Sequence, residues 1–302
     1  MKRIVFGLFL VAAASALSAE PAKVKVDVYV VNVSKLDLAS GKYTANLELI
    51  FTAPPGTKDF KFELLNGEFE PGKLENTTEP EEAAQGIKTY KAVANVDFDP
   101  DFSRFPWDAQ DLSIYVVAEG KTDEIIFEPV TGEESSIAER ANFPGWKISH
   151  GQPTVSETSY QHPNEKFSVY EFPIEISRNP LASFMKVFFP LIIMILLSLL
   201  AVFVGPGAIA NRLTIVTGTL LGAVMFQLNA TSALPQIGYL TLADKIFLAT
   251  YISFLINVGI TMYMWKKNDA KNEEAVKKIY KLALYLVPGA SLVVYILAIA
   301  LA

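Results

Sequence analysis

The sequence contains no cysteine among its 302 residues and only two histidines, His150 and His162. Without cysteine the chain has no disulfide, no thiol nucleophile and no thiolate metal site. Two histidines are too few for a histidine-based metal cage, and they argue against a Ser-His-Asp triad. The sequence also shows no paired nucleophile and base and no metal-ligating cluster. We therefore expect neither an enzyme nor a cofactor.

Charged residues are scarce in the C-terminal part of the chain. Residues 20–178 carry 28 acidic and 15 basic side chains, whereas residues 179–302 carry only 4 acidic and 9 basic ones. The net charge of −6 thus combines an acidic, polar part with a mildly basic, apolar part. Because an acidic domain repels a phosphate backbone, we expect no nucleic acid partner.

The N-terminus has the composition of a secretory signal peptide. Lys2 and Arg3 precede an apolar stretch from Ile4 to Ala14, and small residues follow. The stretch is too short to span a bilayer comfortably. We expect residues 1–19 to be a signal peptide, although a cut after Ala16 fits the small-x-small pattern better. An uncleaved N-terminal anchor is the alternative.

The acidic part, residues 20–178, shows the alternation of apolar and polar residues that is typical of β-strands. The alternation is clear from Val24 to Val30, from Tyr43 to Phe51 and from Ser168 to Ile176. Turn-forming clusters rich in proline, glycine and asparagine lie between these runs. The pattern predicts an extracellular, all-β, immunoglobulin-like sandwich of about 8–10 strands.

Four long apolar segments predict an all-α, four-helix transmembrane domain in residues 179–302. They cover about residues 181–204, 209–232, 240–265 and 279–302, and each is long enough to cross about 30 Å of hydrocarbon as a helix. If the β domain is exported, four crossings leave both termini outside. The cytoplasmic loops then contain basic residues, as the positive-inside rule requires: Arg212, Lys266, Lys267 and Lys271. We expect a multi-pass protein of the inner cell membrane, with its β domain extracellular or periplasmic.

The second apolar segment is rich in small and hydroxylated residues. Steps of three and four residues define a stripe along the predicted helix: Thr214, Gly218, Leu221, Met225, Leu228 and Ser232. Two interpretations remain open. The small residues either allow close packing between helices, or the stripe lines a water-filled pore that rings of Leu221 and Met225 close by dewetting.

Several motifs occur along the chain in a fixed order. Phe105-Pro106-Trp107-Asp108-Ala109-Gln110 is followed by Ile176-Ser177-Arg178, by Pro190 and by the stretch 210–245. The first resembles the Phe-Pro-Phe-Asp-x-Gln signature of the pentameric ligand-gated ion channels, the Cys-loop receptor superfamily. The others resemble the end of that family's last strand, the proline of its first membrane helix, and its pore helix with the following loop. Because Phe98 and Leu112 stand in the cysteine positions of the signature loop, the chain resembles the cysteine-free prokaryotic type over about residues 24–302.

The resemblance implies a homopentamer around a central pore that is lined by the second membrane helix and gated by the β domain. It also implies a gating junction between the two domains, formed by Asp37, Pro106, Trp107, Asp108, Arg178, Pro235 and Tyr239. Asp108 and Arg178 would form an ion pair there, which is costly to break once it is partly buried. Pro106 and Trp107 would press on the loop from Pro235 to Thr241.

The chain departs from the family where agonists usually bind. None of its three tryptophans, at positions 107, 146 and 265, falls in the expected agonist site. The remaining candidates for ligand binding are Tyr160, His162 and Phe167, in the hairpin before the last long strand. Packing of these aromatic side chains within the strands is the alternative.

Two further features concern ions. Asp97, Asp99 and Asp101 alternate, so on a strand they would share one face that could bind a divalent cation, or simply form a solvated acidic surface. Ala210 and Asn211 stand where cation-selective relatives usually carry a carboxylate. The acidic outer domain would nevertheless concentrate cations and favours a cation-permeable pore.

Two functions are therefore compatible with the sequence. The first is a subunit of a homopentameric gated ion channel, whose partners are permeant inorganic ions, the lipid bilayer and identical subunits, and whose effector is a small molecule, a proton or a divalent ion. The alternative is a membrane-anchored extracytoplasmic binding or sensor protein without conductance. Water access to the stripe from Thr214 to Ser232 distinguishes the two.

Overall fold

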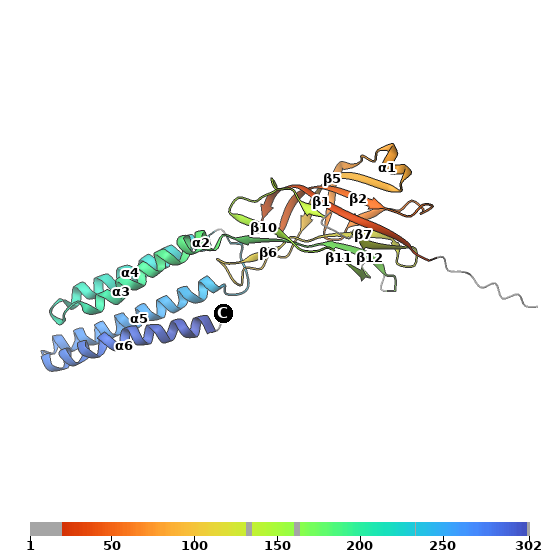
Figure 1. Ribbon diagram of the computed structural model, residues 1–302. Coiled ribbons are helices and arrows are strands. Elements are labelled where there is room, and N and C mark those ends of the chain that lie inside the picture. The colour runs from red at the N-terminus through yellow and green to blue at the C-terminus, as the bar shows by residue number, and fades with distance from the viewer. Residues whose placement is uncertain (1–19, 131–134, 160–163, 233, 301–302) are drawn as a thin grey trace, which may run out of the picture.

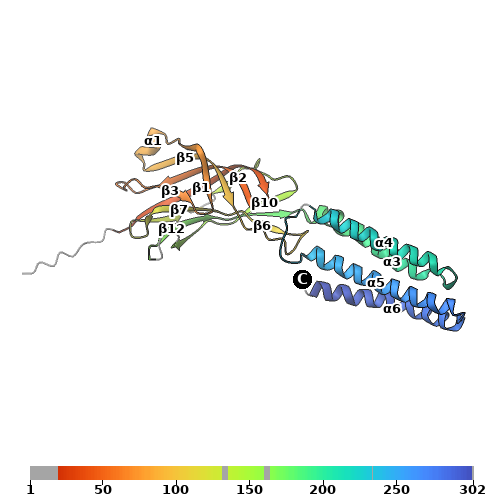
Figure 2. The same ribbon diagram turned by 180° about the vertical axis from the view of Figure 1, so that it is seen from behind.

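The computed structural model describes residues 20–130, 135–159, 164–232 and 234–300. The expected signal peptide, residues 1–19, lies outside these ranges. Figure 1 shows a β domain with four long helices that run side by side away from one of its ends, and Figure 2 shows the same arrangement from behind. The predicted architecture, an N-terminal β-sheet domain followed by four long apolar helices, is confirmed.

The described residues contain thirteen strands in three sheets. The six-stranded sheet has the order β4-β5-β2-β1-β8, with β9 also paired to β1; the four-stranded sheet has the order β11-β12-β7-β3 and the three-stranded sheet β10-β13-β6. The strands are β1 (Ala22–Asp37), β2 (Lys42–Thr52), β3 (Phe62–Leu64), β4 (Gly67–Asn76), β5 (Ile87–Asp97), β6 (Ala109–Asp111), β7 (Ile114–Lys121), β8 (Ile125–Pro129), β9 (Ser136–Ile137), β10 (Trp146–His150), β11 (Thr154–Thr158), β12 (Phe167–Phe172) and β13 (Ile174–Arg178). A short helix, α1 (Pro80–Ala84), precedes β5.

The predicted number of about 8–10 strands is too low because three long strands are interrupted. Pro173, which has no N–H to donate to a ladder, separates β12 from β13. Residues 112–113 separate β6 from β7, and residues 151–153, which include a glycine and a proline, separate β10 from β11. If each interrupted pair is counted as one strand, ten strands remain.

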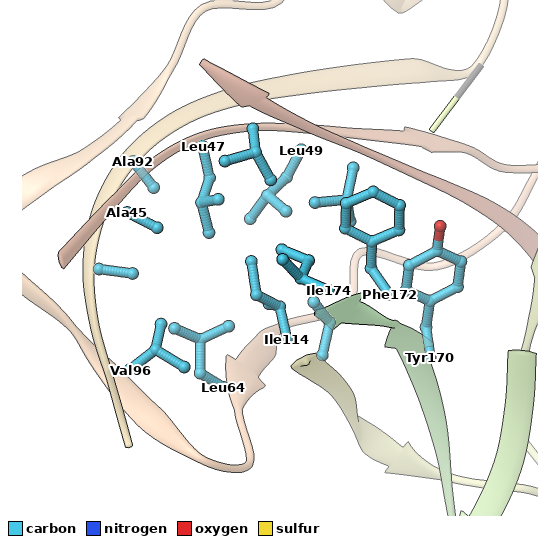
Figure 3. Packing of buried hydrophobic residues seen from close by; sticks show 14 of the residues in the cluster. Ala45, Leu47, Leu49, Leu64, Ala92, Val96, Ile114, Tyr170, Phe172 and Ile174 are labelled. Carbon is cyan, nitrogen blue, oxygen red and sulfur yellow. The ribbon is translucent and has the colours of Figure 1, made fainter. Parts of the chain in front are cut away.

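Burial in the β domain follows the alternation of the sequence. Val24, Val26, Val28 and Val30 of β1 are all 0% exposed. Apolar side chains of β2 and β5 meet those of β7, β12 and β13 across a common core, as Figure 3 shows. The alternating side chains of β1 and β2 therefore bury mainly one face each, as period-two patterning dictates in a two-layer arrangement, whereas β12 is buried on both faces.

The first membrane span combines α2 (Pro180–Ser183), a π-helical turn (Phe184–Phe188) and α3 (Phe189–Leu200). The other three spans contain α4 (Ile209–Thr231), α5 (Leu242–Asp269) and α6 (Glu273–Ala300). All four are long and apolar enough to cross a membrane: Pro180–Phe203, Pro206–Thr231, Leu242–Asp269 and Glu273–Ala300.

The fourth helix begins at Glu273 rather than at the predicted residue 279. The side chain of Asn272 accepts the backbone N–H of Ala275 at 3.0 Å and so caps the helix start. Glu273 and Glu274 then place negative charge in the first turn, where the helix dipole favours it. Only residues 270–272 connect α5 to α6.

Candidate pore helix and domain junction

Asp108 and Arg178 form an ion pair where the β domain meets the helices. Asp108 directly precedes β6, and Arg178 is the last residue of β13. Nε of Arg178 donates to Oδ1 of Asp108 at 2.7 Å, and the side chain of Asp108 is 0% exposed against 24% for Arg178. The structure thus brings together two of the residues that the family resemblance assigned to the junction.

Three further side chains hold this pair, and the sequence analysis did not assign them a role. Nε2 of Gln110 donates to the second carboxylate oxygen of Asp108 at 2.9 Å. The guanidinium of Arg178 lies 4.4 Å from the ring centre of Trp146 and 5.3 Å from that of Phe105. Aromatic faces attract the planar guanidinium, so the two rings hold this group of Arg178 in place from two sides. Gln110 and Phe105 belong to the signature motif itself, whereas nothing in the sequence indicated Trp146.

The loop between β5 and β6 binds the start of α5 through backbone groups. The N–H of Leu242 donates to the carbonyl of Ser103 at 2.9 Å, and the N–H of Ala243 donates to the carbonyl of Phe105 at 3.0 Å. The first N–H groups of a helix have no partner within the helix. The β domain supplies these partners, so the loop and the first turn of α5 form one hydrogen-bonded unit.

Tyr239 joins the same unit from the loop between α4 and α5. Its hydroxyl accepts the N–H of Phe102 at 2.9 Å. The neighbouring Asp101 accepts the backbone N–H of Ser103 at 2.8 Å and its hydroxyl at 3.1 Å. The N–H of Ser103, followed by its hydroxyl, lowers the pKa of Asp101, and the hydroxyl of Tyr239 adds to this shift.

Trp107 contacts the first membrane span, whereas the sequence predicts that it presses on the loop from Pro235 to Thr241. Its indole N–H donates to the carbonyl of Pro180 at 3.2 Å, and its ring centre lies 5.0 Å from that of Phe188. Pro106 is buried beside it, and Pro235 is half-buried in the loop after α4. The hydrogen bonds to that loop and to α5 come instead from residues 102–105, which precede the predicted pair.

Asp37 is not a member of the Asp108–Arg178 ion pair. It ends β1, and its carboxylate accepts the hydroxyl of Ser40 at 2.7 Å and the N–H groups of Ala39 and Ser40 at 2.9 and 3.3 Å. The hydroxyl of Ser40, then these N–H groups, lower the pKa of Asp37. The next residue, Leu38, packs against the apolar cluster of the helices. Asp37 therefore shapes the turn that brings Leu38 to the helices.

The two domains share one apolar cluster at the junction. Phe102 and Phe105 of the β domain are 1% and 7% exposed, and they lie in the same buried cluster as Phe188 and Phe247 of the helices. Buried side chains at protein density transmit displacement because they leave few voids. The loop between β5 and β6, which carries the signature motif and is called the signature loop below, is therefore expected to move together with the first membrane span and the start of α5.

The predicted pore stripe lies on a face of α4 that the chain itself leaves uncovered. In the middle of the stripe, Leu221 and Met225 are 68% and 67% exposed. The span that contains α4 has the smallest buried share of the four, 11% against 39% for the span of α5. All six predicted positions are exposed in the single chain: Thr214, Gly218, Leu221, Met225, Leu228 and Ser232. The small residues of the stripe are thus not used for packing within the chain.

α4 is hydrogen-bonded to α5 near both of its ends. Close to the β domain, Nε2 of Gln227 donates to Oδ1 of Asp244 at 3.1 Å, and the hydroxyl of Tyr251 donates to Oε1 of Gln227. At the other end, Nη2 of Arg212 donates to Oδ1 of Asn257 at 3.0 Å. Because α5 begins in the hydrogen-bonded unit of the junction, a displacement of the signature loop has a direct route to α4.

Of the three candidate ligand residues, only Phe167 lies in the described part of the chain. Tyr160 and His162 lie outside the described residues. Phe167 begins β12 and is only 2% exposed, in a buried cluster with Val117 and Val169. Phe167 thus takes part in the strand packing that the sequence offered as the alternative, and a ligand contact by this residue stays a prediction.

The three alternating carboxylates do not share a strand face. β5 ends at Asp97, whose side chain pairs with Lys42 at 3.2 Å, and Asp99 and Asp101 follow in the loop. Asp101 is engaged by Ser103 as described above. Across the ranges that the structure covers, no group of three or more acidic or histidine side chains could hold a metal ion. The expected divalent site is therefore not formed by these residues.

These features define a multi-pass membrane protein whose motifs resemble those of the cysteine-free pentameric ligand-gated ion channels. In particular, the chain is a distant homologue of a proton-gated ion channel from Gloeobacter violaceus, with 23% identity over 176 residues. The matched region covers 58% of this chain and 48% of the relative, so it spans about half of the relative's length. No model of a known protein family matches the chain. The homology is with an ion channel and not with an enzyme.

Proposed function

We propose that the chain is one subunit of a homopentameric gated ion channel in the inner cell membrane, in which α4 lines the pore and the β domain controls gating. The observation that carries this proposal is the uncovered stripe of α4 in a homologue of an ion channel. Five copies of α4 around an axis would cover the exposed Leu221, Met225 and Leu228 and leave a narrow apolar segment. Such a segment closes a pore when it loses water.

The orientation follows from charge. The helix ends remote from the β domain carry Arg212, Lys266, Lys267 and Lys271 at or beside the loops. Basic residues favour the cytoplasmic side of a membrane, so the β domain lies outside. Its excess of acidic residues would concentrate cations at the outer mouth, which supports a cation-permeable pore.

Gating is proposed to run from the β domain through α5 to α4. The signature loop holds the first turn of α5 by two backbone hydrogen bonds, and α5 holds α4 through Gln227 and Arg212. The effector is a proton, a small molecule or a divalent ion. Because the relative is described as proton-gated, protons are the first effector to test.

Because the sequence contains no cysteine, each introduced cysteine is the only thiol in its variant. Single cysteines are introduced at the six stripe positions and at two control positions, Val216, which is 0% exposed on the packed face of α4, and Ile193, which is 44% exposed on α3. The purified variants are recorded in planar bilayers over a range of pH, and a charged, membrane-impermeant thiol reagent is then added. We expect the reagent to change the current of the stripe variants only.

Two outcomes contradict the proposal. Equal modification at Val216 or Ile193 would show that the stripe has no special access to water. No current from the wild-type protein over pH, Ca²⁺ and small amines, together with unreactive stripe cysteines, would favour the alternative, a membrane-anchored binding or sensor protein without conductance.

A further inference from the structure

The hydroxyl of Ser135 joins three parts of the β domain that lie far apart in the sequence. It donates to Oδ1 of Asp27 at 2.6 Å, and it accepts the backbone N–H of Val28 at 3.2 Å. The hydroxyl of Tyr170 lies 2.7 Å away and donates to it, because the single proton of Ser135 is already used for the carboxylate. Burial raises the pKa of the Tyr170 hydroxyl, which therefore stays protonated and remains a donor. Asp27, Ser135 and Tyr170 are called the Ser135 network below.

Ser135 occupies a gap along the edge of β1. β8 pairs with β1 as far as Val26, and β9 pairs with it from Tyr29 onward. A buried N–H needs an acceptor, and in this gap the side chain of Ser135 accepts the N–H of Val28 in place of a backbone carbonyl. The hydroxyl thus continues the edge of the sheet between its two strand neighbours.

The Ser135 network is buried and carries a charge. Its three side chains are at most 9% exposed, and none of the six ion pairs in the part of the chain that the structure describes includes Asp27. Burial of a carboxylate without a basic partner costs free energy. A hydroxyl whose hydrogen bonds are all used, however, fixes one geometry of the groups around it. The network therefore favours a defined position of these segments over maximal stability.

The first segment that leads from this network to the domain junction is residues 135–145, called the strap below. It lies along β1, where the N–H of Ala138 donates to the carbonyl of Val30 at 2.9 Å. Phe143 is 5% exposed, and its ring centre lies 6.4 Å from that of Tyr43 in an edge-to-face contact. The strap is therefore held to β1 and to the core of the sandwich, and the Ser135 network ties its start to β12.

The second segment is β12 with its continuation, and both segments lead to Arg178. Trp146 directly follows the strap, pairs with Arg178 between β10 and β13, and has its ring centre 4.4 Å from the guanidinium. Tyr170 lies on β12, which leads through Pro173 into β13 and so to the same arginine. The bond between the two hydroxyls therefore closes a ring: the strap and β12 are joined at this bond and meet again at the junction.

We propose, on the basis of the proposed channel function, that the Ser135 network is a latch that positions Trp146 over Arg178 and thereby favours opening of the channel. With the latch closed, the strap and β12 move as one body, and a displacement of β12 reaches the guanidinium of Arg178 together with its aromatic partner. With the latch open, the strap slips against β12, and part of the displacement is lost before it reaches the junction. Asp27, Ser135 and Tyr170 are thus positioning residues that act through Trp146.

The test combines amide hydrogen exchange of the full-length protein in detergent with single-channel recording in planar bilayers. Tyr170→Phe keeps the ring and removes only the hydroxyl. We expect exchange in the strap and in β10 to become about tenfold faster or more, while exchange in β4 and α6 stays unchanged. The open probability should fall about threefold or more at unchanged single-channel conductance.

Tyr115→Phe is the matched control for the loss of a hydroxyl. Tyr115 also donates to a carboxylate, that of Glu171 at 3.1 Å, but this bond joins β7 to β12 rather than β12 to the strap. Exchange in the strap and the open probability should therefore stay at wild-type values. Equal effects of Tyr115→Phe and Tyr170→Phe would overturn the latch.

Ser135→Ala removes the same bond from the other side, and it carries the test if Tyr170→Phe fails to assemble, as judged by size-exclusion chromatography. Because both substitutions break one bond, strap exchange in the double variant should be no faster than in Ser135→Ala alone. Additive effects, or wild-type strap exchange in both single variants, would overturn the latch. Faster exchange at wild-type open probability would overturn its role in gating. No current from the wild type would overturn the channel function, whereas the exchange data would still decide whether the latch exists.

Discussion

Replacing Asp108 with asparagine tests whether the buried ion pair holds the two domains together. The Asp108→Asn substitution would keep the size of the side chain, and the new amide oxygen could still accept from Arg178. The new amide nitrogen would, however, face Nε2 of Gln110, which now donates to the carboxylate at 2.9 Å. Gln110 cannot turn around to accept, because its amide is fixed by two hydrogen bonds of 2.8 Å to the backbone of Asp101. The variant therefore loses both the ion pair and one buried hydrogen bond.

The burial of the ion pair allows an estimate of how much Asp108→Asn lowers the free energy of unfolding. Removing one partner of a buried ion pair costs about 3–5 kcal/mol. Because Arg178 is 24% exposed and stacks on Trp146, its unpaired charge keeps some solvent and an aromatic partner. We therefore expect the free energy of unfolding to fall by about 2–3 kcal/mol, which corresponds to a fall of roughly 4–12 °C in the melting temperature of a domain of this size.

The assay is thermal unfolding of the detergent-purified protein, followed by size-exclusion chromatography of the heated samples. Glu175→Gln is the matched control, since Glu175 lies on the same strand as Arg178 but is exposed; its melting temperature should change by less than about 2 °C. A double variant, Asp108→Leu with Arg178→Met, should recover part of the loss because no charge is left unpaired. Equal shifts in melting temperature for Asp108→Asn and Glu175→Gln would refute the reasoning. A double variant that melts at a lower temperature than Asp108→Asn would also refute it.

Two other predictions concern the pore and the effect of pH. Leu221→Ser should increase the open probability in planar-bilayer recordings, because a ring of hydroxyl groups wets more readily than one of leucine; an unchanged or reduced open probability would argue against a gate at this level. The pKa of Asp101 is lowered from 3.8, so its carboxylate contributes to stability above that value and this contribution is lost only as the pH falls through the lowered pKa. Asp101→Asn should therefore leave the midpoint of any pH response between about pH 5 and 8 unchanged, and a shifted midpoint in recordings at stepped pH would contradict this assignment.

The fold was largely predictable because local patterns specify it. Strict alternation from Tyr43 to Phe51 buries one face, and apolar length identifies the four helices, without knowledge of long-range contacts. The strand interruptions were not predicted, because Pro173 breaks a ladder only once its pairing partners are known. The early start of α6 was missed because apolar length says nothing about a capped, charged first turn.

The site was predictable only where a motif specifies it. Asp108 and Arg178 were named from the family resemblance, and the structure places them 2.7 Å apart. The carboxylate of Asp37 is instead bound within its own turn, which depends on the turn's conformation rather than on residue type. The hydrogen bond from Phe102 to Tyr239 uses the backbone N–H, which any residue except proline supplies, so the residue type at position 102 gave no signal for it.

The position of the tryptophans gives the protein an intrinsic optical probe. Trp107 rests on Phe188 with 43% of its surface exposed, and Trp146 lies over Arg178. Indole emission depends on local polarity and on nearby cations, so two of the three fluorophores of the chain report on the contact between its halves. With Trp265 changed to phenylalanine, stopped-flow emission could follow that contact in unlabelled protein, on the same timescale as a recorded current.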